Sequence, residues 1–196
     1  QKSYELIGEG SSPAEEFNFT IVATKTSHTS VTVAEAPVPT ITSSVTYAAG
    51  DATVGGTATN SVKDIVINFA PNGNLIYNKV GVYEYKLEET IPADASKNLG
   101  VEYDKEPVTL KVYVVNEVDG NNEPTGKLKI SEISLTKKNK KITGLVEGGT
   151  NNNAAFVNKY TANKLNVAKK VYGDAADRDM EFNFKVSFTN ESGKAW

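Results

Sequence analysis

Alternation of apolar and polar side chains is the feature that most restricts how this chain of 196 residues can fold. Successive side chains of an extended strand point to opposite faces, so the pattern gives one apolar and one polar face. Turn residues separate the alternating segments, and no segment has a convincing helical period. We therefore expect an all-β chain, an immunoglobulin-like antiparallel β-sandwich. The segments are 17–25, 44–47, 64–70, 81–89, 108–117, 128–135 and 154–160.

An internal repeat indicates more than one domain. Residues 4–21 and 171–186 each contain a short strand pattern, a polar loop with small and acidic residues, and then the sequence EFNF. We therefore expect a complete domain over 1–161 and, over 162–196, the first strands of a second, similar domain. Two strands do not make a stable core, so we expect this tail to be flexible, paired with another chain or laid against the first domain.

Composition excludes several classes of protein. The formal net charge of −3 gives no electrostatic case for binding nucleic acid or an anionic membrane. No apolar run approaches the ~20 residues needed to span a bilayer, and no signal peptide is present, so an exported protein would be represented here in processed form. The chain has no cysteine. Its one histidine, His28, lies among small polar residues, where we expect a solvated loop.

Three polar residues occupy positions where the alternation calls for apolar ones. Lys2 shares a face with Tyr4 and Leu6, Glu89 with Tyr83, Tyr85 and Leu87, and Asn158 with Phe156 and Tyr160. Each residue alone is more often structural: a lysine that reaches solvent, a glutamate at the rim, an asparagine that satisfies backbone groups. The first and last strands of a sandwich commonly lie side by side, which would bring Lys2 to Asn158. The coincidence of all three favours a shared chemistry.

That chemistry is the formation of an isopeptide bond. Burial lowers the pKa of a lysine and raises that of a glutamic acid, so both groups can be neutral at ordinary pH. We expect the neutral amine of Lys2 to attack Cγ of Asn158. Protonated Glu89 would hydrogen-bond to the carboxamide oxygen and carry protons to the leaving ammonia. In the second copy, Lys169 again lies in an apolar row, with Leu165, Val167 and Val171.

Several segments, in this order, resemble one protein family. They are EFNFTI, GVYEYKLEET followed by GVEYD, VTLKVYVVNE, and FVNKY running into KLNVAKKVYG. The chain resembles the backbone pilin subunits of Gram-positive bacteria, specifically the streptococcal pilin isopeptide-bond domain, whose YxLxET box matches YKLEET. The resemblance implies that Lys2 is the bond-forming amine, Asn158 its amide partner and Glu89 the catalytic acid. It also implies that Lys169 is the equivalent lysine of the next domain, unbonded because the glutamate and asparagine strands of that domain are absent.

The resemblance also implies a biological role. Such subunits form the shaft of an extracellular pilus attached to the cell wall, and a sortase joins them head to tail through a donor lysine. We expect that lysine shortly before the closing strand, but EGGTNNNAAF contains none, and no LPxTG-like signal is present. The nearest lysines are Lys137, Lys138, Lys140 and Lys141, and nothing in the sequence singles one out.

Two other classes of function stay open at this point. One is an adhesin domain that binds a host protein or glycan through long loops at 27–40 and 48–60, although Tyr47 is the one aromatic residue near them. The other is a conventional enzyme. The sequence has no nucleophile–base pair, phosphate-binding loop or metal cluster, and residues 174–179 lack the glycine and glutamate of a calcium loop. We expect no cofactor, no metal and no enzyme activity beyond single-turnover bond formation.

Overall fold

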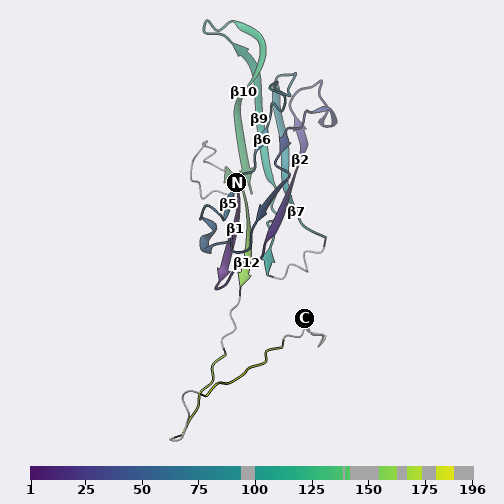
Figure 1. Cartoon of the computed structure of the whole chain (residues 1–196). Helices are drawn as coiled ribbons and strands as arrows, with labels where there is room; N and C mark the ends of the chain where they lie inside the picture. Colours follow the sequence, from purple (N-terminus) through teal and green to yellow (C-terminus); the bar gives the residue numbers. More distant parts are fainter. Residues whose placement is uncertain (94–99, 139, 142–154, 163–166, 174–179, 188–196) are drawn as a thin grey trace. The chain divides into compact units, whose positions relative to one another are not determined.

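The computed structural model describes residues 1–93, 100–138, 140–141, 155–162, 167–173 and 180–187. It divides into two compact units, Gln1–Lys164 and Leu165–Trp196. Within the described ranges the first unit is built of strands, with two short 3-10 helices, η1 (Val33–Glu35) and η2 (Val54–Gly56) (Figure 1). The expected all-β class is confirmed. None of the described residues forms a helix long and apolar enough to cross a membrane.

One sheet of the first unit contains its first and last strands side by side. The strand order is β5 (Val62–Lys63), β1 (Lys2–Gly8), β12 (Phe156–Ala162) and β8 (Val101–Glu102). The predicted neighbourhood of the first and last strands is therefore confirmed. Their direction differs from the expected antiparallel arrangement, because β1 and β12 run parallel and pair Lys2 with Phe156 (Figure 1). Parallel neighbours need a long crossover, and the strands of the other sheet supply it.

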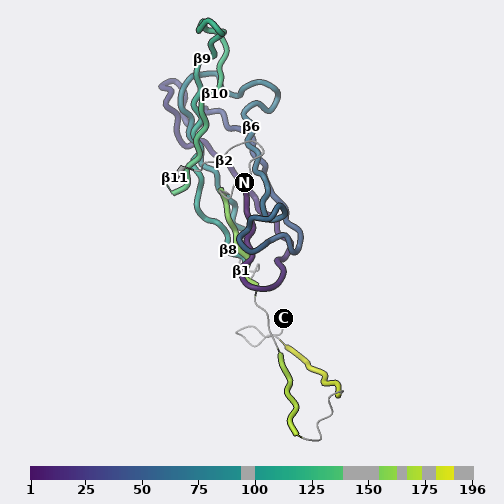
Figure 2. The backbone as a smooth tube through the Cα atoms, turned by 90° about the vertical axis from the view of Figure 1, so that its left-hand side faces the viewer, coloured from purple at the N-terminus to yellow at the C-terminus, as the bar shows by residue number. Residues whose placement is uncertain are grey.

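The second sheet is antiparallel and lies across the core from the first. Its order is β11 (Lys140–Lys141), β10 (Pro124–Lys137), β9 (Val108–Val118), β7 (Gly81–Thr90), β2 (Glu15–Thr26) and β4 (Ser44–Tyr47). The hairpin of β9 and β10 projects beyond its neighbours in both views (Figures 1 and 2). A small third sheet pairs β3 (Thr40–Ile41) with β6 (Ile67–Asn68).

Aromatic residues dominate the core between the two large sheets. Phe17 packs edge-to-face against Tyr4 and Tyr47, with ring centroids 5.2 and 5.6 Å apart. Tyr85 is fully buried, and its hydroxyl donates to the carbonyl of Pro37 at 2.5 Å. A buried tyrosine keeps its apolar contact only if its hydroxyl finds a partner, so this bond ties the 27–40 segment to the core.

Two predictions, one of a loop and one of a strand, need correction. The 48–60 segment is not a free excursion: the amide of Leu6 donates to the carbonyl of Thr53 at 2.9 Å, which holds the segment against β1. Of the strand expected over 64–70, only Ile67–Asn68 forms. The apolar side chains of Ile65, Ile67 and Phe69 are partly buried against the core, which explains the alternation. The described strand that pairs with this segment is the two-residue β3, so only a short ladder forms.

A β-bulge divides β10 into two parts. The register against β9 shifts between Ile130 and Glu132, so the inward-facing positions change parity at this point. Leu128 and Ile130 are partly buried before the bulge, whereas Leu135 is buried beyond it. Lys137 has the same parity as Leu135, and the bulge therefore turns this lysine toward the interior.

The second unit is described only at 167–173 and 180–187. Neither range is assigned as a strand, so the two strands expected from the repeat are not formed in these parts. A strand needs a pairing partner, and within 167–173 and 180–187 no strand pairing is formed. Lys169 lies with its Nζ 5.3 Å from the ring centroid of Phe182. Residues 174–179, which carry the calcium-like sequence, lie outside the described residues.

Candidate functional site

The three polar residues predicted from the alternation lie together in the core of the first unit. Lys2 opens β1, Asn158 lies on the neighbouring β12, and Glu89 is near the end of β7 in the facing sheet. Lys2 and Asn158 are completely buried, and Glu89 is 6% exposed. The opposing strands thus place an amine, a carboxamide and a carboxyl group in one solvent-excluded space.

The carboxyl group of Glu89 contacts both of the other residues. Its Oε2 lies 3.1 Å from Nζ of Lys2, and its Oε1 accepts a hydrogen bond from Nδ2 of Asn158. The Lys2–Glu89 contact is not an aligned hydrogen bond: neither Nζ nor Oε2 has a hydrogen-bond partner among the described residues. One carboxyl group is therefore placed to exchange protons with both the amine and the amide nitrogen.

Aromatic rings enclose the amine. Nζ of Lys2 lies 4.2 Å from the ring centroid of Phe17, where the face of the ring attracts a cation. Tyr47 donates from its hydroxyl to the backbone carbonyl of Lys2 at 2.9 Å, which fixes the start of β1. The strand register pairs Phe156 with Lys2 and Phe19 with Glu89, and these two rings pack with centroids 5.2 Å apart. The amine of Lys2 thus lies in an aromatic part of the core.

Burial shifts the pKa values of the pair toward the neutral forms. Desolvation lowers the pKa of Lys2 to about 8, although the nearby Glu89 carboxylate opposes the shift. Desolvation likewise raises the pKa of Glu89, against the opposing effects of Lys2 and of the hydrogen bond from Asn158. Transfer of one proton from Lys2 to Glu89 gives a neutral amine and a neutral acid, the state in which lysine is a nucleophile.

The carboxamide of Asn158 is oriented differently from the sequence expectation. Its oxygen Oδ1 accepts a hydrogen bond from the backbone amide of Asp104 at 2.8 Å, while its nitrogen faces Glu89. A backbone N–H can only donate, so the atom that faces it must be the oxygen. Glu89 is therefore at the amide nitrogen and not, as expected, at the carbonyl oxygen.

Asp104 is a residue that the sequence reasoning did not single out. It follows β8 in a loop, where alternation defines no inner and outer face, and it contacts Asn158 through its backbone. The segment GVEYD, which contains it, indicates only a family resemblance. A contact made by main-chain atoms leaves no mark in the choice of side chain, so no residue pattern could have identified it.

The other predicted lysines do not join the site in the same way. Lys137 is 20% exposed at its side chain and pairs with Asp104, whereas Lys138 is 65% exposed and lies 3.2 Å from Glu106. The side chains of Lys140 and Lys141 lie outside the described residues. Lys169 belongs to the second unit.

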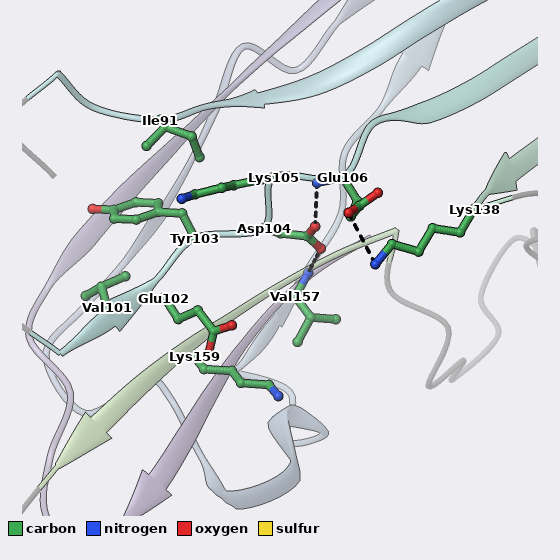
Figure 3. A pocket seen from close by; sticks show the side chains of 10 residues that line it. All are labelled: Ile91, Val101, Glu102, Tyr103, Asp104, Lys105, Glu106, Lys138, Val157 and Lys159. Carbon is green, nitrogen blue, oxygen red and sulfur yellow. Dashed lines mark hydrogen bonds and ion pairs between the residues drawn. The ribbon is translucent and has the colours of Figure 1, made fainter.

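A surface hollow of about 830 Å³ lies beside the buried site (Figure 3). Asp104 and Val157, neighbours of the reacting residues, contribute to its wall. Its remaining polar groups carry both signs of charge, among them Glu102, Lys105 and Lys159. Among the residues that the structure describes, no group of three His, Cys, Asp or Glu side chains is arranged to hold a metal ion.

Comparison with known proteins identifies the family. The model of the Spy0128-like isopeptide containing domain, FctA, matches residues 1–161. A crystal structure of the major pilin from Streptococcus pyogenes is 23% identical, with a TM-score of 0.50 over 81% of this chain and 48% of that one. The structure of a point variant of that pilin is 22% identical, with the same TM-score and coverage. The chain thus spans about half the length of these pilins.

No curated protein sequence matches the chain. The family match nevertheless covers residues 1–161 of 196, which is most of the sequence, and confirms the resemblance seen in the motifs. The chain belongs to the FctA family of Spy0128-like isopeptide containing domains.

Proposed function

We propose that this chain is a structural module of a pilus shaft, stiffened by an isopeptide bond that it forms between its own Lys2 and Asn158. The observation that carries the proposal is the position of Glu89, whose two carboxyl oxygens contact the amine and the amide nitrogen in a buried, aromatic-walled site. Membership of an isopeptide domain family and the shared fold with a streptococcal major pilin support it.

The reaction can be written with every proton accounted for. Lys2 first gives one proton to Glu89, and the neutral Nζ attacks Cγ of Asn158 while the carbonyl electron pair moves to Oδ1. Glu89 then protonates Nδ2, the Cγ–Nδ2 bond breaks, and ammonia leaves as the carbonyl re-forms. The positively charged Nζ of the new amide returns a proton to Glu89, which ends neutral. The step needs no oxidant, cofactor or metal.

Burial supports this reaction in two ways. Packing of β1 against β12 holds the amine beside the amide, and reactants held in position react as if at very high concentration. Exclusion of water also keeps the amine neutral and prevents hydrolysis of the activated amide. The chain turns over once, so this chemistry does not make the protein an enzyme in the usual sense.

The proposed partners follow from the pilus role. They are other pilin subunits, joined by a sortase on the outside of the cell and finally attached to the cell wall. Of the two lysines in the 137–141 cluster whose side chains the structure describes, Lys137 is 20% exposed and paired with Asp104, whereas Lys138 is 65% exposed, so Lys138 is the more open to such an enzyme. Tyr47, the aromatic residue nearest the loops of the adhesin alternative, is fully buried, and this favours the structural role.

Intact mass spectrometry of three variants tests the proposal. Gln1 can also lose ammonia by cyclisation, so all three are made in a Gln1→Ser background. The Gln1→Ser chain should be lighter than its sequence by one ammonia, because the isopeptide bond has formed. Adding Glu89→Ala or Asn158→Ala should restore the full sequence mass. A full sequence mass in the Gln1→Ser chain itself would contradict the proposal.

A further inference from the structure

The hydrogen bond to the oxygen of Asn158 assigns a role to a residue outside the Lys2–Glu89–Asn158 set. We propose that the backbone N–H of Asp104 stabilises the negative charge that develops on Oδ1 during bond formation, and that the Asp104 carboxylate positions this N–H. The inference rests on the proposed function, since it concerns the transition state of the same reaction.

The reacting carbonyl of Asn158 already has a hydrogen-bond donor at its oxygen. When Nζ of Lys2 attacks, an electron pair moves onto Oδ1, which becomes an oxyanion in a site closed to water. The Asp104 amide already lies 2.8 Å from this oxygen before the reaction begins. A donor fixed in advance strengthens as charge develops and needs no reorganisation, which is how oxyanion holes act. Glu89 is occupied at the amide nitrogen and at the amine.

The side chain of Asp104 fastens this amide to β12. Its Oδ2 accepts a hydrogen bond from the backbone amide of Val157 at 2.9 Å, and its Oδ1 accepts one from the amide of Glu106 at 3.1 Å (Figure 3). Val157 directly precedes Asn158 in the chain. The loop that carries the donor and the strand that carries the reacting amide are therefore held to each other at adjacent residues.

Lys137 completes this arrangement from a third element. Its Nζ donates to Oδ2 of Asp104 at 2.5 Å and to the carbonyl of Ala155 at 2.7 Å, and lies 5.1 Å from the ring centroid of Phe156. Burial opposes ionisation of Asp104, but Lys137 and the two backbone amides outweigh it and lower the pKa of the carboxyl group. Asp104 therefore stays ionised and keeps its hold on β12.

A backbone substitution at position 104 removes the N–H donor and keeps the side chain, so the two roles can be tested one at a time. The full chain is made by cell-free synthesis with the α-hydroxy acid of aspartate at position 104, which replaces the N–H by an ester oxygen and keeps the carboxylate. Synthesis is stopped, and samples are taken at successive times, quenched in denaturing acid and digested. The fraction of the Lys2 peptide that is joined to the Asn158 peptide is measured at each time. Loss of one oxyanion donor slows known enzymes by about 10²–10³-fold, and we expect at least about a tenfold slowing here.

The matched control lies in the turn between β9 and β10. The backbone amide of Asn121 donates to Oδ1 of Asp119 at 2.8 Å, a bond of the same length from a backbone amide to a side-chain oxygen, in an exposed position away from the site. An ester at Asn121 should leave the rate of bond formation within about twofold of the wild type, because it removes a comparable hydrogen bond that does not touch the reacting oxygen.

Side-chain variants test the positioning role. Asp104→Ala keeps the N–H but releases it from β12, so we expect slowing by several-fold, less than for the ester. Asp119→Ala is the control, since that carboxylate also accepts two backbone amides, those of Asn121 and Glu123. The unfolding midpoints of the two alanine variants, each combined with Glu89→Ala to prevent bonding, show whether they are destabilised to different extents.

The outcomes are distinct. Slowing by the ester at 104, with little effect of the ester at 121, supports the donor. Equal rates for the 104 ester and the wild type overturn it while leaving the isopeptide bond in place. Equal rates for Asp104→Ala and Asp119→Ala overturn the positioning role alone. A wild-type chain with no joined peptide overturns the proposed function and this inference with it.

Discussion

Lys2 and Glu89 lie close enough to share one proton, so they titrate as a coupled pair. The reactive state has a neutral amine and a protonated acid, and it holds the same number of protons as the ion pair from which it forms. A change of pH that adds or removes one proton from the pair therefore removes the reactive state. This coupling decides how the rate of bond formation should depend on pH.

We predict that the rate of bond formation is highest between the two pKa values of the pair. Below the raised pKa of Glu89 both groups are protonated, and the charged amine cannot attack. Above the lowered pKa of Lys2, about 8, the pair has lost its shared proton and Glu89 cannot protonate the leaving nitrogen. The measurement is the initial rate of formation of the joined peptide after newly synthesised chain is transferred to buffers of different pH.

A rate that continues to rise above pH 8 would contradict this prediction, since it would mean that a neutral amine suffices without a protonated Glu89. The control is the Asn158→Ala chain, which should give no joined peptide at any pH.

At the level of single residues, the sequence predicts side chains that break a pattern and misses contacts that no pattern records. Lys2, Glu89 and Asn158 stand out because each interrupts an apolar face, and the structure brings them together. Asp104 does not, because its contact to Asn158 is made by the main chain. The orientation of the Asn158 amide follows from that missed contact and was expected wrongly for the same reason.

Among the elements, the parallel pair of β1 and β12 decides whether the site exists. Gly8 ends β1 opposite Ala162 at a φ of 89°, and a Cβ added there would lie 2.3 Å from the carbonyl oxygen of Ala162. Gly55 has a similar φ of 76° but open space around its Cα. A substitution at either glycine would strain the backbone, but only one at Gly8 would also disturb the pairing of β1 with β12.

We predict that Gly8→Ala destabilises the first unit by about 2 kcal/mol more than Gly55→Ala. Both substitutions place a side chain at positive φ, but only the first forces β1 away from β12. The free energy of unfolding is measured with urea in an Asn158→Ala background, where no cross-link masks the difference. Equal destabilisation by the two would show that the end of the β1–β12 ladder contributes little.

The sequence predicts elements well where side-chain parity and backbone pairing agree. The segments 44–47 and 81–89 form β4 and β7 almost as expected. The 64–70 segment fails because its apolar side chains reach the core while its backbone lacks a long partner. The bulge in β10 has a trace in the sequence, since its apolar residues are spaced by two up to Ile130 and by three to Ile133.

For the first unit as a whole, the proposed bond between Lys2 and Asn158 would close most of the domain into one covalent loop. On the chain-entropy treatment of cross-links, a loop of this length stabilises the folded state by roughly 5 kcal/mol. The parallel direction of β1 and β12 adds a mechanical consequence. Force applied at the two ends of the unit loads these neighbouring strands in shear, and the bond would carry that force directly.

We predict that the cross-link removes most of the extension seen when the chain is pulled from its ends. Without the bond, unfolding of residues 2–158 would release roughly 500 Å of chain, because extended residues span about 3.3–3.6 Å each. Single-molecule force spectroscopy should show this release for Glu89→Ala and not for the wild type. A similar release in both chains would contradict a load-bearing role for the bond.

The central claim, that Lys2 and Asn158 are joined through the action of Glu89, is tested most directly by tandem mass spectrometry of a tryptic digest. A bonded Lys2 resists trypsin, so the wild type should give peptide 1–25 joined to peptide 142–159, with fragment ions that locate the link at Lys2 and Asn158. Glu89→Ala should give separate linear peptides 3–25 and 142–159. Separate linear peptides from the wild type would contradict the claim.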